Sequence, residues 1–361
     1  MTTRVDPTKL LVLFGAGASA DLCPDAGPIL DGEYEPPVLR TMFQKKAFDE
    51  AFNYFPRAHG IMSDVRSEVR AEKGVAFEET LSELAQSGDP DIVRAMLEVP
   101  LALQLYFSRI SDRYTNQPIN YSALMTRLMR RGIKVAFATL NYDTLLEQAV
   151  AQFTGKSPTP GEFVYQGTQG RWSITKLHGS VDWGFPWFSD GDFHDGVDAM
   201  RMGASVPFTD RRDIEMGIPY NLKQREHWYY PALALPVSGK GFVCPPEMEQ
   251  RLARFMGECE NFLFIGFSAQ DDDVLDFLAR NMRKVEPNHI PPFRGGVVSK
   301  DDVDAVCERL SRVPPLSRAF EENLIVRFGQ GFTKFIENNL HQFLDYLQMD
   351  FTDAFLQRTQ R

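Results

Sequence analysis

Short apolar runs recur along the chain, and most of them end in a small or polar residue. Each run is rich in β-branched or aromatic residues and has the length of a strand, so the pattern predicts β-strands. The six predicted strands are Leu10–Phe14, Val135–Leu140, Ser173–Leu177, Phe262–Phe267, Gly296–Ser299 and Leu324–Phe328. Continuous apolar runs of this kind are typical of strands buried on both faces of a parallel sheet.

Helical periodicity fills the segments between the predicted strands. Tyr121–Arg131 and Thr144–Phe153 repeat apolar residues at helical spacing, and residues 333–361 are expected to form a closing amphipathic helix. Strands that alternate with helices predict an α/β fold, here a Rossmann-like doubly wound parallel sheet.

Two stretches do not fit this alternation. Residues 41–116 carry helical periodicity without a clear strand, as in Phe77–Leu84, and predict a helical insertion. Residues 184–246 are rich in Pro, Gly, Asp and aromatic residues and predict a second, irregular insertion. The core is therefore expected to comprise residues 1–40, 117–183 and 247–361. The aromatic residues at the start of the second insertion are expected to cover the core or the mouth of a cleft.

Composition narrows the class of protein. The 361 residues suffice for one large domain with insertions or for two domains. Hydrophobic residues make up 43% and charged residues 24%, as expected for an ordinary packed core. No run approaches about 20 apolar residues, and the first apolar run is too short for a signal peptide, so we expect a cytoplasmic protein that does not span a membrane. The net charge of −10 argues against direct nucleic-acid binding.

The sequence predicts no metal site. The four cysteines, Cys23, Cys244, Cys259 and Cys307, form no C-x-x-C pair, which argues against a zinc ribbon and against a redox motif. The acidic residues within 190–198 do not match the pattern of a calcium-binding EF-hand loop. We interpret that segment as a solvated acidic loop.

The first candidate for chemistry is the sequence Gly-Ala-Gly-Ala-Ser at residues 15–19, directly after the first predicted strand. Gly15 and Gly17 permit a tight turn and the close approach of a phosphate group, and the start of the next helix offers free N–H groups. The pattern is shorter than the full dinucleotide-binding fingerprint, so a plain strand–turn–helix joint is the alternative.

Three polar residues follow the second and third predicted strands. Because the carboxyl ends of parallel strands line the ligand crevice of such sheets, Asn141, Asp143 and His178 are candidates for a site. Asn141 offers a donor and an acceptor, and Asp143 can bind a hydroxyl group or cap the next helix. An imidazole has an unperturbed pKa of about 6.5, which suits a general base, although a lone histidine is also common as a surface or core residue.

The fourth predicted strand ends in Gly-Phe-Ser-Ala-Gln-Asp-Asp-Asp at residues 266–273. Gly266 and Ser268 belong to a small polar turn that can hold a second phosphate group. Asp271–Asp273 can instead serve only to favour the N-terminus of the next helix through its dipole.

The order of these motifs resembles that of the sirtuin family. GAGAS, then TLNYD at 139–143, KLHG at 176–179 and GFSAQDDD at 266–273 follow one another as in that family. The Gly27-Pro28 pair is similar to the family's G-x-P segment. The helix FEETLSEL resembles the bacterial branch found in anti-phage defence proteins.

The resemblance implies NAD as the ligand and assigns a role to each candidate. The implied phosphate-binding residues are Gly15, Ala16, Gly17 and Ser19, with Ser268 on the phosphate and ribose side. The implied active-site residues are Asn141, Asp143 and the catalytic His178.

Two departures from the family bear on the activity. Deacetylating sirtuins carry a zinc module with paired C-x-x-C motifs after the catalytic histidine, whereas the next cysteine here, Cys244, has no such partner. They also carry Asp-Phe-Arg after the G-x-P proline, whereas Pro28 is followed here by Ile29, Leu30 and Asp31. Both departures favour the defence branch, whose members hydrolyse NAD.

The resemblance therefore implies an NAD hydrolase that needs no metal and acts in anti-phage defence by NAD depletion. The alternatives are an NAD-dependent protein deacylase and a module that binds NAD or ADP-ribose without turnover. Stand-alone chains of this branch are often paired with a separate ATPase, so the resemblance also implies a homo-oligomer and a HerA-type ATPase partner.

Overall fold

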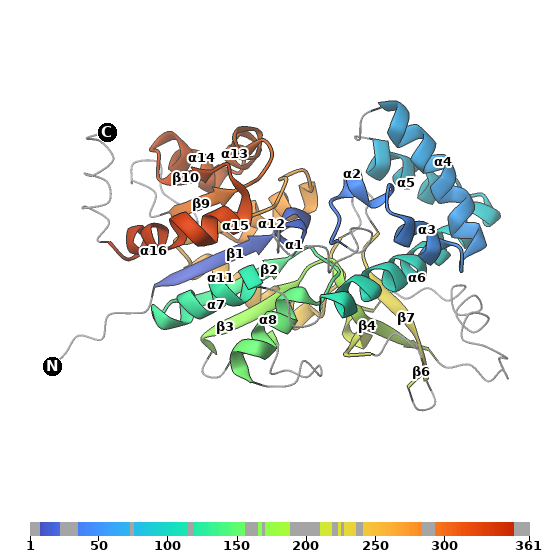
Figure 1. The fold of residues 1–361 in the computed structure, drawn as a ribbon, viewed down its shortest axis with the longest axis horizontal. Helices are drawn as coiled ribbons and strands as arrows, with labels where there is room; N and C mark the ends of the chain where they lie inside the picture. Colours follow the sequence, from blue (N-terminus) through green and yellow to red (C-terminus); the bar gives the residue numbers. More distant parts are fainter. Residues whose placement is uncertain are drawn as a thin grey trace.

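Figure 1 shows the fold in a computed structural model of the chain. The structure describes residues 8–21, 35–72, 76–114, 119–155, 165–167, 170–187, 210–218, 223–224, 227–235, 241–283 and 293–349. The Gly27-Pro28 pair, the acidic segment 190–198 and the last part of the predicted closing helix lie outside the described residues.

The six predicted strands form one parallel sheet. They are β1 (Lys9–Phe14), β2 (Lys134–Thr139), β3 (Trp172–Lys176), β8 (Asn261–Ile265), β9 (Arg294–Val298) and β10 (Ile325–Phe328). Their order across the sheet is β10-β9-β8-β1-β2-β3, and every neighbouring pair is parallel. Counted along the chain, this is the Rossmann order 3-2-1-4-5-6. The predicted fold class is confirmed.

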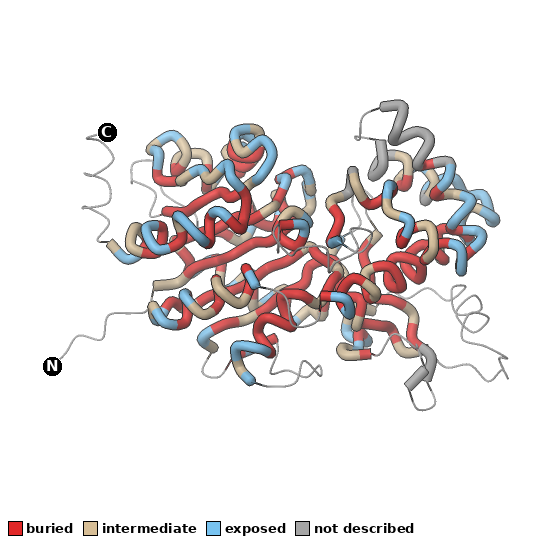
Figure 2. Tube along the Cα trace, in the orientation of Figure 1, coloured by how far each residue is buried: buried red, intermediate tan, exposed pale blue. Residues whose placement is uncertain are grey.

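Helices cover both faces of this sheet. All residues of β8 and β9 are buried, and so are five of the six residues of β1, which requires a layer on each side (Figure 2). The helices of this part are α1 (Ala16–Ala20), α7 (Ile119–Arg130), α8 (Leu145–Thr154), α11 (Pro246–Glu258), α12 (Asp272–Asn281), α13 (Val303–Ser311), α14 (Pro314–Glu321), α15 (Gly331–Lys334) and α16 (Leu340–Gln348). A π-helical turn at Phe335–Asn339 joins α15 to α16.

The segment 41–116 is helical over its described part, and its helices gather at one end of the molecule (Figure 1). They are α2 (Leu39–Met42), α3 (Lys46–Phe52), α4 (Pro56–Glu72), α5 (Ala76–Gln86) and α6 (Pro90–Arg113). The long helix α6 packs against the small sheet described next, so it links this helical part to the rest of the chain.

The insertion at 184–246 is more regular in its described residues than the sequence predicts. This stretch contributes to a four-stranded antiparallel sheet with the order β5-β4-β7-β6. Its strands are β4 (Gly179–Trp187), β5 (Glu215–Met216), β6 (Lys223–Gln224) and β7 (His227–Leu233). Two strands have only two residues, prolines interrupt the other two, and the register of β4 shifts between Gly179 and Gly184. These features hide the alternation that normally predicts strands.

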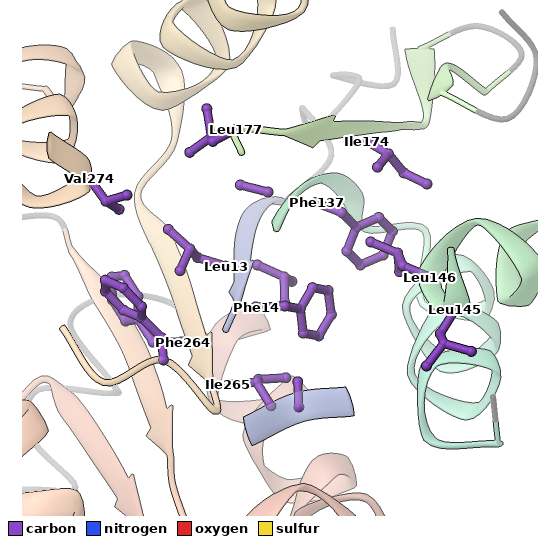
Figure 3. Close-up of a cluster of buried hydrophobic side chains, with 14 of the residues drawn as sticks. Leu13, Phe14, Phe137, Leu145, Leu146, Ile174, Leu177, Phe264, Ile265 and Val274 are labelled. Carbon is purple, nitrogen blue, oxygen red and sulfur yellow. The ribbon is translucent and has the colours of Figure 1, made fainter. Parts of the chain in front are cut away.

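Apolar side chains from several elements meet below the carboxyl ends of the central strands, as Figure 3 shows. The labelled residues are Leu13, Phe14, Phe137, Leu145, Leu146, Ile174, Leu177, Phe264, Ile265 and Val274. They come from the strands β8, β1, β2 and β3, the β3–β4 turn and the helices α8 and α12. A close-packed core at this level holds the loops above it in fixed positions.

Candidate functional site

A cleft of about 760 Å³ opens at the carboxyl ends of the parallel strands. The order of the sheet reverses between β1 and β8, and open α/β sheets bind their ligands at such a switch point. The loops after β1, β2, β3, β8 and β9 all contribute to the lining. The volume lies within the range of small-molecule and cofactor sites.

All nine residues that the sequence singles out line this cleft. They are Gly15, Ala16, Gly17, Ser19, Asn141, Asp143, His178, Gly266 and Ser268. They follow four different strands, and the topology of the sheet brings those strand ends to one edge. The four sequence motifs that follow predicted strands therefore all contribute residues to this cleft.

The glycines of the two turns pack directly against each other. The amides of Gly15 and Gly17 donate to the carbonyl oxygens of Ile265 and Gly266, both at 3.0 Å. A Cβ atom on Gly15 would lie 2.5 Å from the carbonyl oxygen of Gly266. Gly266 has a φ of +59°, and a Cβ there would overlap the backbone nitrogen of Ala18. The β1–α1 and β8–α12 turns can therefore touch only because glycine occupies these positions, whether or not a ligand is bound.

The side chain of Asn141 is held in one orientation. Its Nδ2 atom donates to the carbonyl oxygen of Gly15 at 3.1 Å and to Ser19 Oγ at 2.9 Å, and it lies 3.4 Å from Tyr121 Oη. A carbonyl oxygen only accepts, so the atom that faces Gly15 must be the nitrogen. The Oδ1 atom is therefore the acceptor that Asn141 keeps for a ligand.

Tyr121 belongs to this network, although its place in the sequence predicts only a helix. Its hydroxyl lies 3.0 Å from Ser19 Oγ. Burial raises the pKa of the Tyr121 phenol well above its usual value, and the charge of Asp143 adds to this effect. The hydroxyl therefore stays protonated. Tyr121 lies 102 residues from Ser19, and no local pattern reveals such a pair.

Asp143 is buried beside Asn141 and caps the next helix. Its Oδ1 atom accepts from the amide of Leu145, the first residue of α8, at 3.1 Å. Burial raises the pKa of the Asp143 carboxyl group, and the positive charge of Lys176 is the largest opposing effect. The capping alternative is thus observed, and it does not remove Asp143 from the lining of the cleft.

His178 lies at the junction of β3 and β4 and is only 6% exposed. Its Nε2 atom lies 3.2 Å from Oδ2 of Asp271. The other oxygen of Asp271 accepts from the amide of Val274 at 3.1 Å and so caps α12. From the sequence, only this helix-end role of Asp271 is expected. The pairing with His178 is not evident there, because β8 and β3 are separated in the sheet by two other strands.

A buried ion pair lies next to the candidate residues Asp143 and His178. Lys176, two residues before His178, is fully buried, and its Nζ atom lies 2.9 Å from Oε1 of Glu147. The same Nζ atom donates to the main-chain oxygen of Asp143. Strand β3, which leads into His178, is thereby tied to the loop that carries Asn141 and Asp143. Lys176 begins the KLHG motif but receives no role of its own from the sequence, and Glu147 belongs to none of the motifs.

This pair leads to a prediction about pH. Burial raises the pKa of Glu147 from 4.5 to about 7, against the effect of Lys176. The folded protein therefore holds a proton that the unfolded chain releases, so the free energy of unfolding falls as pH rises from about 4.5 to about 7. We expect Glu147→Gln to lack this contribution, which amounts to roughly 3 kcal/mol over the whole interval. Urea unfolding of the wild type and of Glu147→Gln at several pH values measures this contribution. The same pH dependence of the free energy of unfolding in both proteins would contradict the prediction.

The segment after β9 brings cationic and acidic side chains to the lining of the cleft. Lys300 and Arg309 belong to the lining after β9, and Arg309 Nε donates to the main-chain oxygen of Ser268 at 2.9 Å. Met42, Leu103 and Phe107 give another part of the lining an apolar surface. The site thus offers two cationic side chains, next to the carboxylates of Asp301 and Asp302, and an apolar surface.

Two further kinds of feature are absent from the described part of the chain. Within those ranges, no three His, Cys, Asp or Glu side chains gather as metal ligands do. None of the helices described there is both long and apolar enough to cross a membrane.

A comparison with models of protein families finds a match over part of the chain. Residues 135–305 match the family model of the SIR2-like domain. The resemblance to sirtuins is thereby confirmed for the part of the chain that holds TLNYD, KLHG and GFSAQDDD, whereas GAGAS precedes the matched residues. No curated protein matches the chain.

Among solved structures, the chain is similar to several Sir2 proteins at low identity. A Sir2 homologue in complex with NAD has 15% identity and a TM-score of 0.45, with 95% of this chain and 92% of that chain covered. A Sir2 homologue mutant with ADP-ribose has 14% identity and a TM-score of 0.45, with 96% and 95% covered. Sir2 bound to an acetylated peptide has 13% identity and a TM-score of 0.38, with 93% and 94% covered.

Proposed function

We propose that this protein hydrolyses NAD at the bond between nicotinamide and ribose. Water enters, and nicotinamide, ADP-ribose and one proton leave. The observation that supports this proposal is the meeting of Asn141, Asp143 and His178 with the two glycine turns in one cleft at the switch point. A dinucleotide that crosses a switch point places its pyrophosphate over these turns.

The cleft fits such a substrate in charge and shape. A pyrophosphate above the interlocked turns is within reach of Arg309, whose Nε atom is fixed against the main-chain oxygen of Ser268. The nicotinamide ribose then lies toward Asn141 and His178, next to the apolar wall formed by Leu103 and Phe107. An apolar wall favours release of a neutral pyridine from a cationic nucleotide, because it solvates the charged ground state poorly.

Three side chains have different roles in the proposed reaction. Positive charge develops on the ribose as nicotinamide departs, and the buried carboxyl group of Asp143 is placed to stabilise it or to bind a ribose hydroxyl. Asn141 is held by its amide nitrogen, so its Oδ1 atom accepts from the attacking water or a ribose hydroxyl. His178 takes the proton that water or that hydroxyl gives up.

Incubation of the purified protein with NAD, followed by mass analysis of the products, tests the proposal. We expect nicotinamide and ADP-ribose without any added peptide. Release of nicotinamide only in the presence of an acyl-lysine peptide would instead identify a protein deacylase. Intact NAD despite measurable binding would identify a module that senses NAD or ADP-ribose.

We extend the proposal to anti-phage defence by NAD depletion. The order of the motifs and the lack of paired C-x-x-C motifs in the sequence support the defence branch. An enzyme that depletes its own cell of NAD must be held inactive until triggered. We therefore propose a homo-oligomer and a HerA-type ATPase partner, and the incubation with NAD includes an arm with the product of the neighbouring gene.

A further inference from the structure

We infer that Tyr121 is a positioning residue: its hydroxyl group holds Ser19, and through Ser19 it keeps Asn141 and Asp143 in one arrangement. The inference deepens the proposed function, on which its kinetic part rests. Among the described residues, the lining of the cleft includes Ser19, Asn141 and Asp143 but not Tyr121. Any effect of Tyr121 on a bound ligand must therefore pass through these neighbours.

The ring of Tyr121 is only 2% exposed and packs against two phenylalanines. Its centroid lies 4.9 Å from that of Phe14, the last residue of β1, and 5.6 Å from that of Phe332 in α15. Both contacts are edge-to-face, with interplanar angles of 82° and 64°. Close packing of this kind fixes the direction of the side chain, so the hydroxyl group stays beside the turn that follows β1.

The hydroxyl group of Tyr121 has two polar partners among the described residues, and they determine which way its hydrogen points. Asn141 Nδ2, at 3.4 Å, is an amide nitrogen that only donates, so it cannot receive the phenolic hydrogen. Ser19 Oγ, at 3.0 Å, can receive it. Because a buried O–H group without an acceptor is costly, Tyr121 donates to Ser19.

The hydroxyl group of Ser19 is buried and fully used by its neighbours. A hydroxyl group accepts two hydrogen bonds and donates one. Ser19 Oγ accepts from Tyr121 and from Asn141 Nδ2, the latter at 2.9 Å. The single hydrogen of Ser19 is then left for the carboxyl group of Asp143. Burial raises the pKa of Asp143, and the hydrogen bond with Ser19 is one of the effects that lower it.

This bonding pattern favours a role for Ser19 that differs from the phosphate binding implied by the resemblance. The oxygens of an anionic pyrophosphate only accept, so they would need the hydrogen that Asp143 receives. Ser19 instead joins the amide of Asn141 to the carboxyl group of Asp143, and the phenolic hydrogen of Tyr121 sets its orientation. A small displacement of either residue lowers turnover, because the proposed reaction depends on their placement.

The substitution Tyr121→Phe removes only the hydroxyl group and keeps the ring contacts with Phe14 and Phe332. Ser19→Ala removes the group through which Tyr121 acts. The matched control is Tyr346→Phe, which removes a hydroxyl group that donates to the main-chain oxygen of Leu324 at 2.9 Å, away from the residues that line the cleft.

Urea unfolding of Tyr121→Phe, Ser19→Ala and the double variant tests the pair without any reference to turnover. The hydrogen bond that the two residues share can be lost only once. We therefore expect the double variant to lose less unfolding free energy than the sum of the two single losses. Additive losses would overturn the inference, since the two hydroxyl groups would then not be coupled.

Nicotinamide release and calorimetry test the link to function. Tyr121→Phe should lower kcat by about 5- to 50-fold and Ser19→Ala at least as much, with no further loss in the double variant. Tyr346→Phe should keep the wild-type kcat. ADP carries the diphosphate without the nicotinamide ribose, so its Kd reports phosphate contacts and should be the same in Tyr121→Phe, Ser19→Ala and the wild type.

Two results would contradict this part of the inference. A Kd for ADP that rises about tenfold or more in Ser19→Ala would identify Ser19 as a phosphate ligand. A wild-type kcat in Tyr121→Phe would show that the hydroxyl group has no positioning role. If the unfolding data show the coupling but the wild type does not turn over NAD, the proposed function fails and the hydrogen-bonded arrangement stands.

Discussion

Replacement of His178 by alanine is expected to lower the rate of nicotinamide release by about 10²- to 10⁴-fold, the usual contribution of a general base. The ring is almost fully buried in the cleft and pairs with Asp271, so the substitution removes the proton acceptor without opening the core of the sheet. Nicotinamide release measured at saturating NAD, together with thermal unfolding of the same sample, separates loss of chemistry from loss of fold.

A matched control is His341→Ala. His341 is exposed on α16, pairs with Asp345 one turn along the same helix and lies 3.0 Å from Arg131, and such exposed contacts have little energetic weight. That variant should keep both turnover and stability.

Asn141→Ala should also abolish release, but it removes a donor from Gly15 and Ser19 and so costs about 1–3 kcal/mol of stability as well. Wild-type turnover in His178→Ala would refute the role assigned to this residue.

The architecture of the site follows from features that local sequence displays. Buried strands of a parallel sheet appear as continuous apolar runs, and each of the six runs marks a real strand. In a parallel sheet the residues after these strands must meet at one edge. The positions of Gly15, Asn141, His178 and Gly266 directly after their strands are therefore enough to predict that they share one cleft.

The partners of these residues were not predictable in the same way. Tyr121 lies within a helix, Asp271 caps another, and Lys176 occupies a strand position where an apolar residue is normal. Tyr121 and Asp271 have ordinary local explanations, and the connection of all three residues to the site depends on distant elements of the fold. The small antiparallel sheet was missed for a different reason, because strands as short as β5 and β6 leave no periodicity to detect.

The sequence correctly predicts that Gly15 and Gly17 belong to the site, but it gives only part of the reason why they are glycines. The sequence explained Gly15 and Gly17 by the close approach of a phosphate group. The structure adds a contact within the protein, since both amides donate to the neighbouring turn and a side chain on either glycine would collide with Gly266. Only the sheet order, with β8 beside β1, brings the two turns together, and the sequence alone does not fix that order.

This contact makes Gly266 a position where a single methyl group should damage the fold around the cleft. At a φ of +59°, an alanine costs roughly 1–2 kcal/mol for the left-handed conformation. Its Cβ atom would also overlap Ala18 and lie 2.7 Å from Cα of Gly17, so the two turns must separate, at a further cost of about 1–3 kcal/mol.

We therefore expect Gly266→Ala to lower the free energy of unfolding by about 2–5 kcal/mol, a large share of the stability of an ordinary domain. Separation of the turns also displaces the carbonyl oxygen of Gly15, which holds Asn141, so turnover should fall even in the molecules that stay folded. Urea unfolding and nicotinamide release measure the two effects. Gly257→Ala is the control, because its Cβ meets nothing closer than 3.7 Å in α11 and should be neutral or stabilise by up to about 1 kcal/mol. A Gly266→Ala protein as stable as the wild type would show that the turns do not touch.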